Sequence, residues 1–358
     1  MKKIIFVLAH LQYSDGVAKV LCDICNALPK DEYDITVKSL YRCDKDFIKN
    51  FDSHIKVTTF CGKYFRGLDK LLEFIPKKIL YKMVINDKYD VEIGFQYGLS
   101  TQIIAASTNN NASHIAWMHG YDEGLVLIDS YKKMKKVVCV SKCNAQRLEK
   151  ESHGKVNADY CYNLVHDKEI KMLSMKECEL QKNNYPLFVS VGRHTSEKGY
   201  KRLISIFDEL HREGKVFQCL LIGDGPEHEE LKSLINENKL TDVVILLGAK
   251  KNPHKYTRMA DVFICSSFSE GYSTACTEAA VLGIPIITTD VSGGAEIIEE
   301  AECGVLTGID DESLKNAIRT VLDDPQLLKQ WKLKAKETSV RFSMQEREQR
   351  MQELFKNL

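Results

Sequence analysis

The stretch that most constrains the fold is residues 260–290, in the C-terminal third of the chain. Residues 262–265 form a short apolar run with β-branched and aromatic side chains, which is typical of a buried parallel strand. Residues 266–273 are polar and contain a glycine, and residues 274–282 carry alanine and apolar side chains at helical spacing. Residues 284–288 are typical of a further strand. The pattern predicts strand, loop, helix and strand, the repeating unit of an α/β fold.

The loop of this unit is a candidate ligand site. It follows a predicted strand and opens onto a helix N-terminus, where α/β sheets hold ligands and unpaired amides attract anions. Glu270 lies in the loop and Glu278 in the first turns of the helix, so two carboxylates bracket the expected anion site. Carboxylates accept hydrogen bonds, which suits hydroxyl-rich ligands. The pattern predicts a site for a phosphate that carries sugars, and the alternative is two solvated surface glutamates.

Length and composition narrow the class of protein. A chain of 358 residues is too long for one ordinary core and favours two α/β domains. Its 50 basic residues balance 50 acidic ones, so nothing indicates a nucleic-acid partner. The 12 cysteines lie mostly in apolar runs or on predicted helices, which favours free thiols in a reducing compartment. Cys22 and Cys25 have no further metal ligands at matching spacing, and we assign them to core packing.

The opening residues 1–10 imitate a signal peptide. Their apolar run is short, and residues 12–15 are polar where a cleavage site needs small side chains, so we predict a first strand over residues 4–9. No apolar run approaches the length of a membrane span. We therefore expect a cytoplasmic protein.

The first half of the chain continues the alternation of strand and helix. The first strand, a polar loop and a helix over residues 16–28 open a Rossmann-like unit that has no Gly-x-Gly-x-x-Gly fingerprint. Further strands are expected over residues 33–40, 55–60, 91–95, 114–118 and 137–140. His119 follows one of these strands and is placed to face a cleft. A pKa near neutrality would let it donate a hydrogen bond to a sugar hydroxyl or a phosphate. The alternative is a structural histidine.

Two other segments of the first half allow more than one interpretation. Asp44 and Asp46 match an Asp-x-Asp metal motif, but their charged, helix-like setting favours a solvated face. Residues 65–83 combine apolar and basic side chains, interrupted by Pro76. They fit an amphipathic helix packed on the core, which we favour, or an interfacial helix that would bring the protein to the inner face of the cell membrane.

The second half begins after a charged linker. Residues 167–184 break the alternation of strand and helix, so we expect one domain over residues 1–166 and another over residues 185–341. The first strand of the second domain leads into a loop that contains Arg193 and Lys198 beside glycines. A planar guanidinium and a compact ammonium at a strand end suit a phosphate group, and the alternative is a pair of surface cations.

Together these motifs resemble the donor site of family 4 retaining glycosyltransferases, which are nucleotide-sugar enzymes of the GT-B fold. The resemblance is carried by Glu270-Gly271-Tyr272 with Glu278, Gly283-x-Pro285, Asp290-x-x-Gly293-Gly294-x-Glu296-Ile297, Gly192-Arg193 with Lys198-Gly199, and Gly223-Asp224-Gly225-Pro226. It covers nearly the whole chain, most strongly residues 187–309. It implies two Rossmann-like domains that face across a cleft, an acceptor-binding one over residues 1–166 and a donor-binding one over residues 185–341. A C-terminal helix over residues 342–358 is expected to cross back to the first domain.

The resemblance also implies how the donor diphosphate is held. Arg193, Lys198 and the amides of residues 272–274 are expected to stabilise it, so that neither a metal nor a cofactor is needed. Asp15 and Gly16 stand where family members often carry two adjacent glycines, and Gly16 is expected to approach the diphosphate; the alternative is a plain helix-capping turn.

The roles of the remaining residues concern the sugars. Glu278 is expected to bind the ribose, Glu270 the 3- and 4-hydroxyls of the hexose, and His119 its 6-hydroxyl or the phosphate. The expected catalytic residues are His119, Arg193, Lys198 and Glu270. The expected donor-binding residues are Gly16, Arg193, Lys198, Gly223, Gly248, Glu270, Gly271, Tyr272, Ser273, Thr274 and Glu278.

The implied reaction moves a hexose or N-acetylhexosamine from a nucleotide sugar, expected to be UDP-linked, to an acceptor hydroxyl with retained anomeric configuration. The acceptor is expected to be a sugar or a lipid-linked molecule in cell-surface polysaccharide or glycolipid synthesis. Two alternatives remain at this stage. A nucleotide-sugar epimerase of the same fold would release a changed donor without an acceptor, and a non-catalytic partner subunit would keep the donor pocket as a scaffold.

Overall fold

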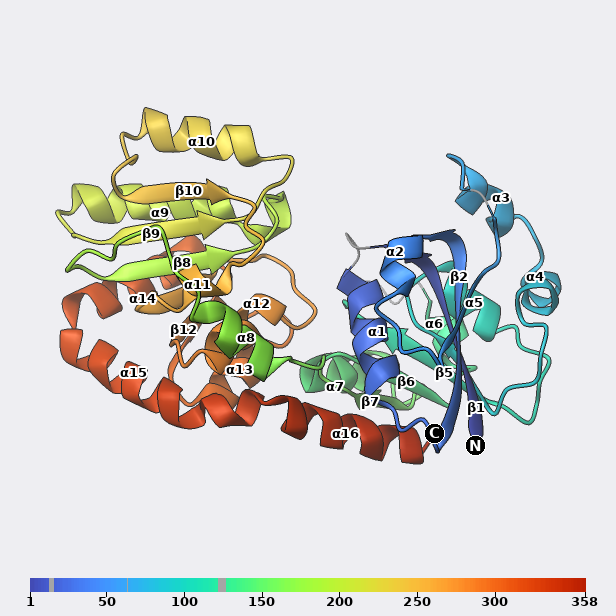
Figure 1. Ribbon diagram of the computed structural model, residues 1–358. Coiled ribbons are helices and arrows are strands. Elements are labelled where there is room, and N and C mark those ends of the chain that lie inside the picture. The colour runs from blue at the N-terminus through green and yellow to red at the C-terminus, as the bar shows by residue number, and fades with distance from the viewer. Residues whose placement is uncertain (13–15, 63, 122–126) are drawn as a thin grey trace. The chain divides into compact units, whose positions relative to one another are not determined.

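The computed structural model of the protein describes residues 1–12, 16–62, 64–121 and 127–358. These residues form two compact units (Figure 1). The N-terminal unit comprises Met1–Leu164 together with Arg347–Leu358, and the C-terminal unit comprises Val165–Glu346. Each unit contains one parallel sheet with helices between its strands.

The sheet of the N-terminal unit has the strand order β3-β2-β1-β4-β5-β6-β7, and all its neighbouring strands are parallel. The expected first strand, β1, lies inside the sheet between β2 and β4, and its residues 4–8 are fully buried because helices cover both faces of the sheet. The strands are β1 Lys2–Leu11, β2 Tyr33–Cys43, β3 Lys56–Thr59, β4 Val91–Gly94, β5 Ser113–Met118, β6 Lys136–Cys139 and β7 Ala158–Tyr160. The helices are α1 Gly16–Ala27, α2 Lys45–Ile48, α3 Leu68–Glu73, α4 Lys77–Val84, α5 Leu99–Ile104, α6 Ile128–Tyr131 and α7 Lys142–Glu151.

The last helix, α16 (Met344–Lys356), completes the core of the N-terminal unit. Phe355 is fully buried, and its ring lies 6.1 Å from that of Phe6 on β1 and 6.0 Å from that of Trp117 on β5. Met351 and Leu354 are buried beside it. A helix distant in sequence therefore contributes to this core, as the sequence predicted for the C-terminal tail.

The sheet of the C-terminal unit has the order β10-β9-β8-β11-β12-β13, again parallel throughout. Its strands are β8 Leu187–Val191, β9 Gln218–Ile222, β10 Val244–Gly248, β11 Val262–Cys265, β12 Ile286–Thr289 and β13 Gly304–Thr307. Its helices are α8 Asp167–Ser174, α9 Tyr200–Arg212, α10 His228–Glu237, α11 His254–Thr257, α12 Thr274–Val281, α13 Gly294–Ala301, α14 Asp311–Asp323 and α15 Pro325–Thr338. The chain order reverses between β8 and β11, and ligands bind at the carboxyl ends of strands at such a switch point.

This fold decides two of the alternatives raised by the sequence and bears on a third. Asp44 caps α2 by accepting a hydrogen bond from the amide of Asp46, so the Asp-x-Asp pair is a solvated helix start. Cys22 and Cys25 are buried on α1, as expected for core packing. Residues 65–83 form α3 and α4 on either side of Pro76, with one face of each helix in the core. In the described ranges no helix has both the length and the apolar character to cross a bilayer.

Candidate functional site

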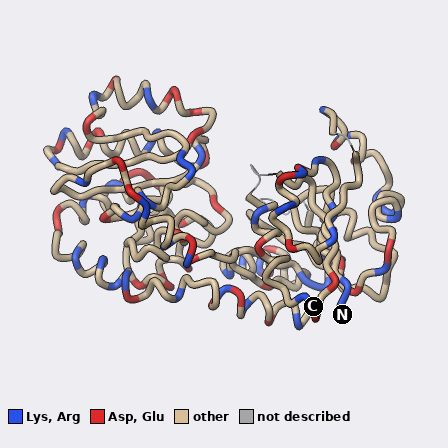
Figure 2. The backbone as a smooth tube through the Cα atoms, viewed as in Figure 1, with Lys and Arg blue, Asp and Glu red and all other residues tan. Residues whose placement is uncertain are grey.

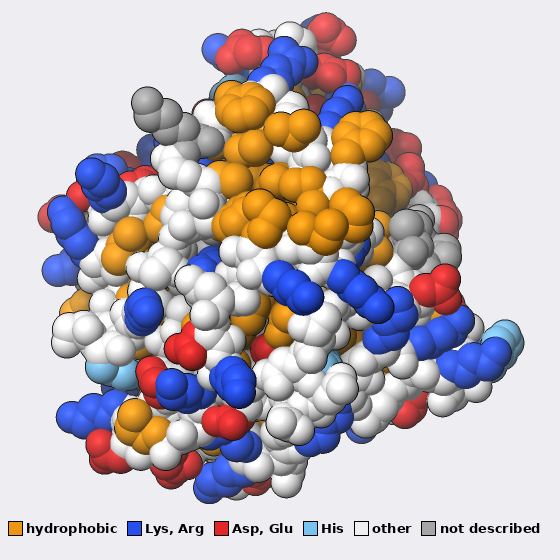
Figure 3. Space-filling view, turned by 90° about the vertical axis from the view of Figure 1, so that its right-hand side faces the viewer, with side chains coloured by type: hydrophobic (Ala, Val, Ile, Leu, Met, Phe, Trp, Pro, Cys, Tyr) orange, Lys and Arg blue, Asp and Glu red, His pale blue; other side chains and the backbone are white. Residues whose placement is uncertain are grey.

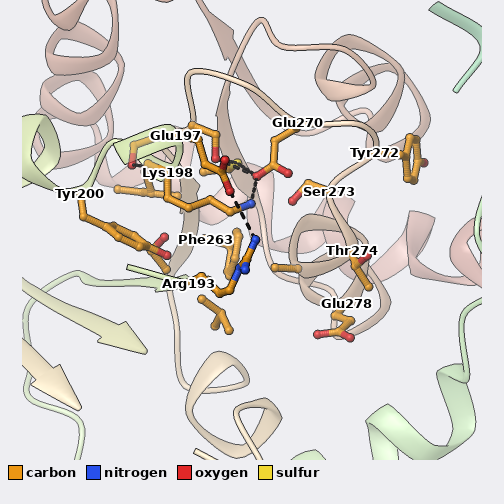
Figure 4. Close-up of a pocket in the computed structure, with 18 residues that line it drawn as sticks. Arg193, Glu197, Lys198, Tyr200, Phe263, Glu270, Tyr272, Ser273, Thr274 and Glu278 are labelled. Carbon is orange, nitrogen blue, oxygen red and sulfur yellow. Dashed lines mark hydrogen bonds and ion pairs between the residues drawn. The ribbon is translucent and has the colours of Figure 1, made fainter. Parts of the chain in front are cut away.

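A cavity of about 340 Å³ lies at the carboxyl ends of β8 and β11 in the C-terminal unit (Figure 4). Its walls are the end of β8 with the loop that follows, the loop after β11, and the first turns of α12. The structure brings together the sequence-predicted residues Arg193, Lys198, Glu270, Tyr272, Ser273, Thr274 and Glu278 in this lining. The cavity therefore coincides with the switch point of the sheet.

One wall of the cavity is the start of α12. Ser273 is the N-cap, and its hydroxyl oxygen accepts a hydrogen bond from the amide of Cys276 at 3.4 Å. Thr274 and Glu278 are four residues apart and therefore lie on the same face of the helix, which is the face that lines the cavity. Small side chains at Cys276 and Ala279 allow the opposite face to be fully buried. A helix N-terminus aimed at a cavity favours an anionic ligand.

An ion pair lies across the cavity from α12. The Lys198 ammonium is 2.6 Å from Oε1 of Glu270, and the Ser267 hydroxyl donates to the same oxygen at 2.7 Å. The two side chains are 22% and 14% exposed. Oε2 of Glu270 has no hydrogen-bond partner among the residues the structure describes. The pair thus holds the carboxylate in place and leaves one of its oxygens for a ligand (Figure 4).

The two loops that carry this pair are fastened to each other. Gly199 has a left-handed φ of +66°, and a Cβ there would lie 2.2 Å from the carbonyl oxygen of Ser266. The Ser266 hydroxyl donates to the carbonyl oxygen of Lys198 at 2.9 Å. The buried guanidinium of Arg202 donates to the carbonyl oxygens of Ser266 and Ser267 at 3.0 and 3.1 Å. These contacts fix the distance between Lys198 and the loop after β11.

Arg202 and Ser267 were not identified from the sequence. Arg202 lies on α9 four residues after Lys198, and its guanidinium also stacks over the ring of Phe268, with its carbon 3.8 Å from the ring centre. An arginine among the apolar residues on the buried face of α9 was the available signal. Its partners could not be read from the sequence, because Ser266 and Ser267 are more than 60 positions away.

Arg193 is the exposed cation of the site. Its side chain is 77% exposed, and its guanidinium lies 3.8 Å from the carboxylate of Glu197. In Figure 4 it extends into the cavity toward Glu197 and Lys198. A cation that is well hydrated and held by one long contact can reorient toward a phosphate at little cost.

Of the other predicted residues of the C-terminal unit, Gly223, Gly248 and Gly271 do not line the cavity. Gly223 follows β9 directly and has a φ of +147°, and a Cβ there would lie 1.8 Å from the carbonyl oxygen of Gly192. Its amide donates to the carbonyl oxygen of Gly248 at 3.0 Å. Gly271 accepts from the amide of Gly293 at 3.4 Å. The Tyr272 ring is buried and points away from the ion pair (Figure 4). Gly223 thus allows the chain after β9 to approach the chain after β8 closely.

His119 and Gly16 belong to the N-terminal unit. Nε2 of His119 lies 3.0 Å from the carbonyl oxygen of Phe95, which can only accept, so Nε2 carries the proton. Burial lowers the pKa of His119 to about 4. The expectation of a hydrogen-bond donor with a pKa near neutrality is therefore wrong: the ring is neutral at pH 7, and Nδ1 can only accept. Gly16 begins α1, and Asp15 lies outside the described residues.

The described residues include one group that could offer three ligands to a metal, namely His194, Asp224 and His228, whose ligand atoms all lie within 4.8 Å of one another. The two Nδ1 atoms are 3.0 Å apart. A hydrogen bond in which one ring donates to the other accounts for this contact. Burial and the neighbouring His228 ring lower the pKa of His194, which favours its neutral form. None of the three lines the cavity.

Comparison with known proteins first defines a class. Residues 174–338, all within the C-terminal unit, match the family model described as "Glycosyl transferases group 1". This stretch holds the whole lining of the cavity. The match and the relatives below support a group 1 glycosyltransferase of the GT-B fold.

Among particular relatives, the chain is 30% identical over 209 residues to the N-acetylgalactosamine-N,N'-diacetylbacillosaminyl-diphospho-undecaprenol 4-alpha-N-acetylgalactosaminyltransferase of Campylobacter jejuni. That match covers 58% of this chain and 56% of the relative. A match at 30% identity to an uncharacterized glycosyltransferase of Methanocaldococcus jannaschii covers 56% and 54%. The chain thus spans about half the length of these two relatives. It is 24% identical to the lipopolysaccharide core biosynthesis glycosyltransferase LpsD of Rhizobium meliloti, over 89% of this chain and 88% of LpsD.

Solved structures are similar over the whole chain. HepE of Anabaena in complex with UDP has a TM-score of 0.77 at 18% identity and covers 100% of both chains. Sucrose-phosphate synthase from Thermosynechococcus elongatus has a TM-score of 0.77 at 17% identity, covering 100% of this chain and 99% of that one. These likenesses confirm the predicted fold class, an α/β protein with two Rossmann-like sheets in the GT-B arrangement of elements.

Proposed function

We propose that the protein is a family 4 retaining glycosyltransferase that moves a hexose or N-acetylhexosamine from a UDP-linked sugar to an acceptor hydroxyl. The observation that carries the proposal is the cavity in which the start of α12 faces the Lys198–Glu270 pair. A helix N-terminus with two nearby cations suits a diphosphate, and a fixed carboxylate suits sugar hydroxyls. The bound UDP of HepE and the undecaprenol-linked substrate in the name of the Campylobacter relative support a UDP donor and a lipid-linked or sugar acceptor.

The diphosphate is the leaving group of the proposed reaction. The bond between the anomeric carbon and the diphosphate oxygen breaks, and the acceptor oxygen forms its bond on the same face of the sugar. The acceptor proton passes to the leaving phosphate oxygen. Negative charge grows on that oxygen as the bond breaks, and we propose that the amides of residues 272–274, Lys198 and Arg193, which come from residues that line the cavity, stabilise it. The charge is carried by side chains and amides, so the proposal needs no metal and no cofactor.

The sugars of the donor meet the carboxylates. Glu270 can accept hydrogen bonds from hexose hydroxyls through Oε2, because Oε1 is occupied by Lys198 and Ser267. Glu278 lies on the cavity face of α12 and is proposed to accept from the ribose hydroxyls. His119 can meet a ligand hydroxyl as an acceptor through Nδ1.

Turnover of a UDP-sugar by Arg193→Ala and Lys198→Ala variants tests this function. Each variant loses a cation that acts on developing charge, so kcat should fall by about 100-fold for Lys198→Ala and by a smaller factor for the exposed Arg193→Ala. Arg212→Ala, which removes an exposed arginine of α9 outside the cavity, is the matched control and keeps the wild-type rate.

Turnover of both cavity variants at the wild-type rate would remove the electrostatic account. Product analysis in the same assay separates the alternatives. An epimerase yields a changed nucleotide sugar without an acceptor, and a scaffold subunit yields neither transfer nor donor hydrolysis.

A further inference from the structure

Helices α3 and α4 of the N-terminal unit carry large apolar side chains on their outer face as well as on their inner face. Their inner face is packed in the core through Leu68, Leu72, Leu80, Tyr81 and Val84. Their outer face, with the segment that precedes α3, exposes large apolar side chains by 47% to 87%, namely Tyr64, Phe65, Leu71, Phe74, Ile79 and Met83. We call these six side chains the α3–α4 face. Exposed apolar side chains that gather on one surface mark an interaction site, so this face calls for an occupant.

The exposed apolar side chains are concentrated here. Among the described residues, 16 large hydrophobic side chains are exposed, and six of them fall within residues 64–83. Figure 3 shows hydrophobic side chains gathered in one patch on the side of the molecule where α3 and α4 lie, with Lys and Arg next to it. Scattered single residues would need no explanation, whereas a continuous patch marks a binding surface.

Basic residues accompany the patch. Residues 64–83 contain five basic side chains and two acidic ones, a net charge of +3, whereas the whole chain has a net charge of zero. Arg66, Lys70, Lys78 and Lys82 are exposed, and Figure 2 shows the basic residues along α4. On α4, Ile79 and Met83 are four residues apart, as are Lys78 and Lys82. An apolar stripe and a cationic stripe therefore run side by side along this helix.

We propose that the α3–α4 face docks on the surface of an anionic phospholipid bilayer. The local positive charge complements anionic headgroups, and the apolar side chains, with Phe74 at 87% exposure the most prominent, enter the boundary with the acyl chains. Helices of six and eight residues are too short to span a bilayer and lie along its surface. An apolar patch beside an excess of basic side chains fits an anionic lipid surface better than a protein partner, whose interface would not need a net positive charge.

This surface lies within the N-terminal unit and shares no residue with the cavity of the C-terminal unit. Docking is therefore measured without donor or acceptor, and the outcome is independent of the proposed reaction.

Co-sedimentation with vesicles tests the proposal on the full chain. Wild-type protein should bind vesicles of mixed phosphatidylglycerol and phosphatidylcholine. Its binding to vesicles of pure phosphatidylcholine should be weaker by about tenfold or more, because the charge attraction is lost. Its binding to the anionic vesicles should fall as the salt concentration rises. Replacing Lys70, Lys78 and Lys82 by Gln should weaken binding by about fivefold for each lysine. Replacing Leu71, Phe74, Ile79 and Met83 by Ser should remove it.

Matched control variants carry the same changes elsewhere. Lys155, Lys232 and Lys329 are exposed lysines outside the face, and Met172 and Met175 are exposed methionines of the C-terminal unit. Changing these lysines to Gln, or these methionines to Ser, should leave vesicle binding at the wild-type level. A thermal melt of each variant establishes that it is folded.

A fluorescent reporter gives a second readout that does not depend on loss of binding. Phe74→Trp places an indole on the face, and its emission should shift to the blue when anionic vesicles are added. Met172→Trp should show no shift. Equal binding of wild type and both face variants would overturn the proposal. So would a wild-type dimer that the four-serine variant converts to a monomer while neither binds vesicles, because a second copy would then be the occupant.

Discussion

The ion pair of Lys198 and Glu270 predicts that one substitution, Glu270→Gln, has opposite effects on two measurements: it strengthens the binding of UDP and slows transfer from the complete donor. In the ligand-free protein Lys198 is held by Glu270 at 2.6 Å, so a diphosphate must compete with the carboxylate for it. Glu270→Gln removes the competing charge and keeps the shape of the side chain. UDP, which has no hexose to contact Glu270, should then bind more tightly, whereas transfer from a UDP-sugar should slow.

The size of the effect follows from the burial of the pair. Side chains that are 22% and 14% exposed place it between exposed ion pairs, worth a fraction of a kcal/mol, and buried ones, worth several. We take about 1–2 kcal/mol for the contact, which corresponds to a Kd for UDP lower by about five- to thirtyfold in Glu270→Gln. Glu197→Gln is the control, because its 3.8 Å contact with the exposed Arg193 should change the Kd by less than about twofold.

Calorimetric titration with UDP measures these constants, and a double-mutant cycle assigns their cause. Lys198→Met should raise the Kd. In that background Glu270→Gln should give a clearly smaller gain, which measures only the removal of a negative charge near the diphosphate. An equal gain from Glu270→Gln with and without Lys198 would show that the lysine is not what the carboxylate holds back, and the reasoning would fail.

Three further predictions concern other parts of the C-terminal unit. Glu278→Ala should abolish donor binding in the calorimeter, and wild-type affinity would refute its assignment to the ribose. Gly199→Ala should lower the melting temperature, because strain at its left-handed φ costs about 1–3 kcal/mol and the new Cβ would meet a backbone oxygen. Gly16→Ala is the control, because a Cβ there would meet open space and should leave the melting temperature unchanged. Burial alone would raise the pKa of Asp261, but hydrogen bonds from Lys182 and Lys332 outweigh it and lower the pKa. The stability from this carboxylate is therefore lost as pH falls below about 4, and melts of Asp261→Asn should lack that component.

Much of the fold could be predicted because parallel strands buried on both faces are continuous apolar runs. The strand over residues 262–265 and the helix that starts at Thr274 appear as expected. β7 (Ala158–Tyr160) was not predicted, since it is an edge strand of three half-buried residues without an apolar run. Local pattern thus identifies central strands and gives little signal at the sheet edge.

The sequence could predict which residues belong to the site where those residues lie in loops at strand ends. Glu270 and Lys198 could be placed at one site, but their mutual ion pair depends on how two loops 72 positions apart are fastened. The protonation of His119 depends on the carbonyl oxygen of Phe95 and on burial, and neither is visible in the residues around it. The sequence could not show that α3 and α4 have one face in the core and another exposed, because it was interpreted as a choice between core packing and membrane contact for the whole segment.

The central claim is that the start of α12 and the two cations hold a diphosphate without a metal. Its most direct test is calorimetric titration of EDTA-treated protein with UDP and with UMP, since the two ligands differ by the β-phosphate alone. The account predicts that UDP binds at least about tenfold more tightly than UMP, worth about 1.4 kcal/mol, with no change on adding a divalent cation. UDP binding no tighter than UMP, or appearing only after a divalent cation is added, would contradict it.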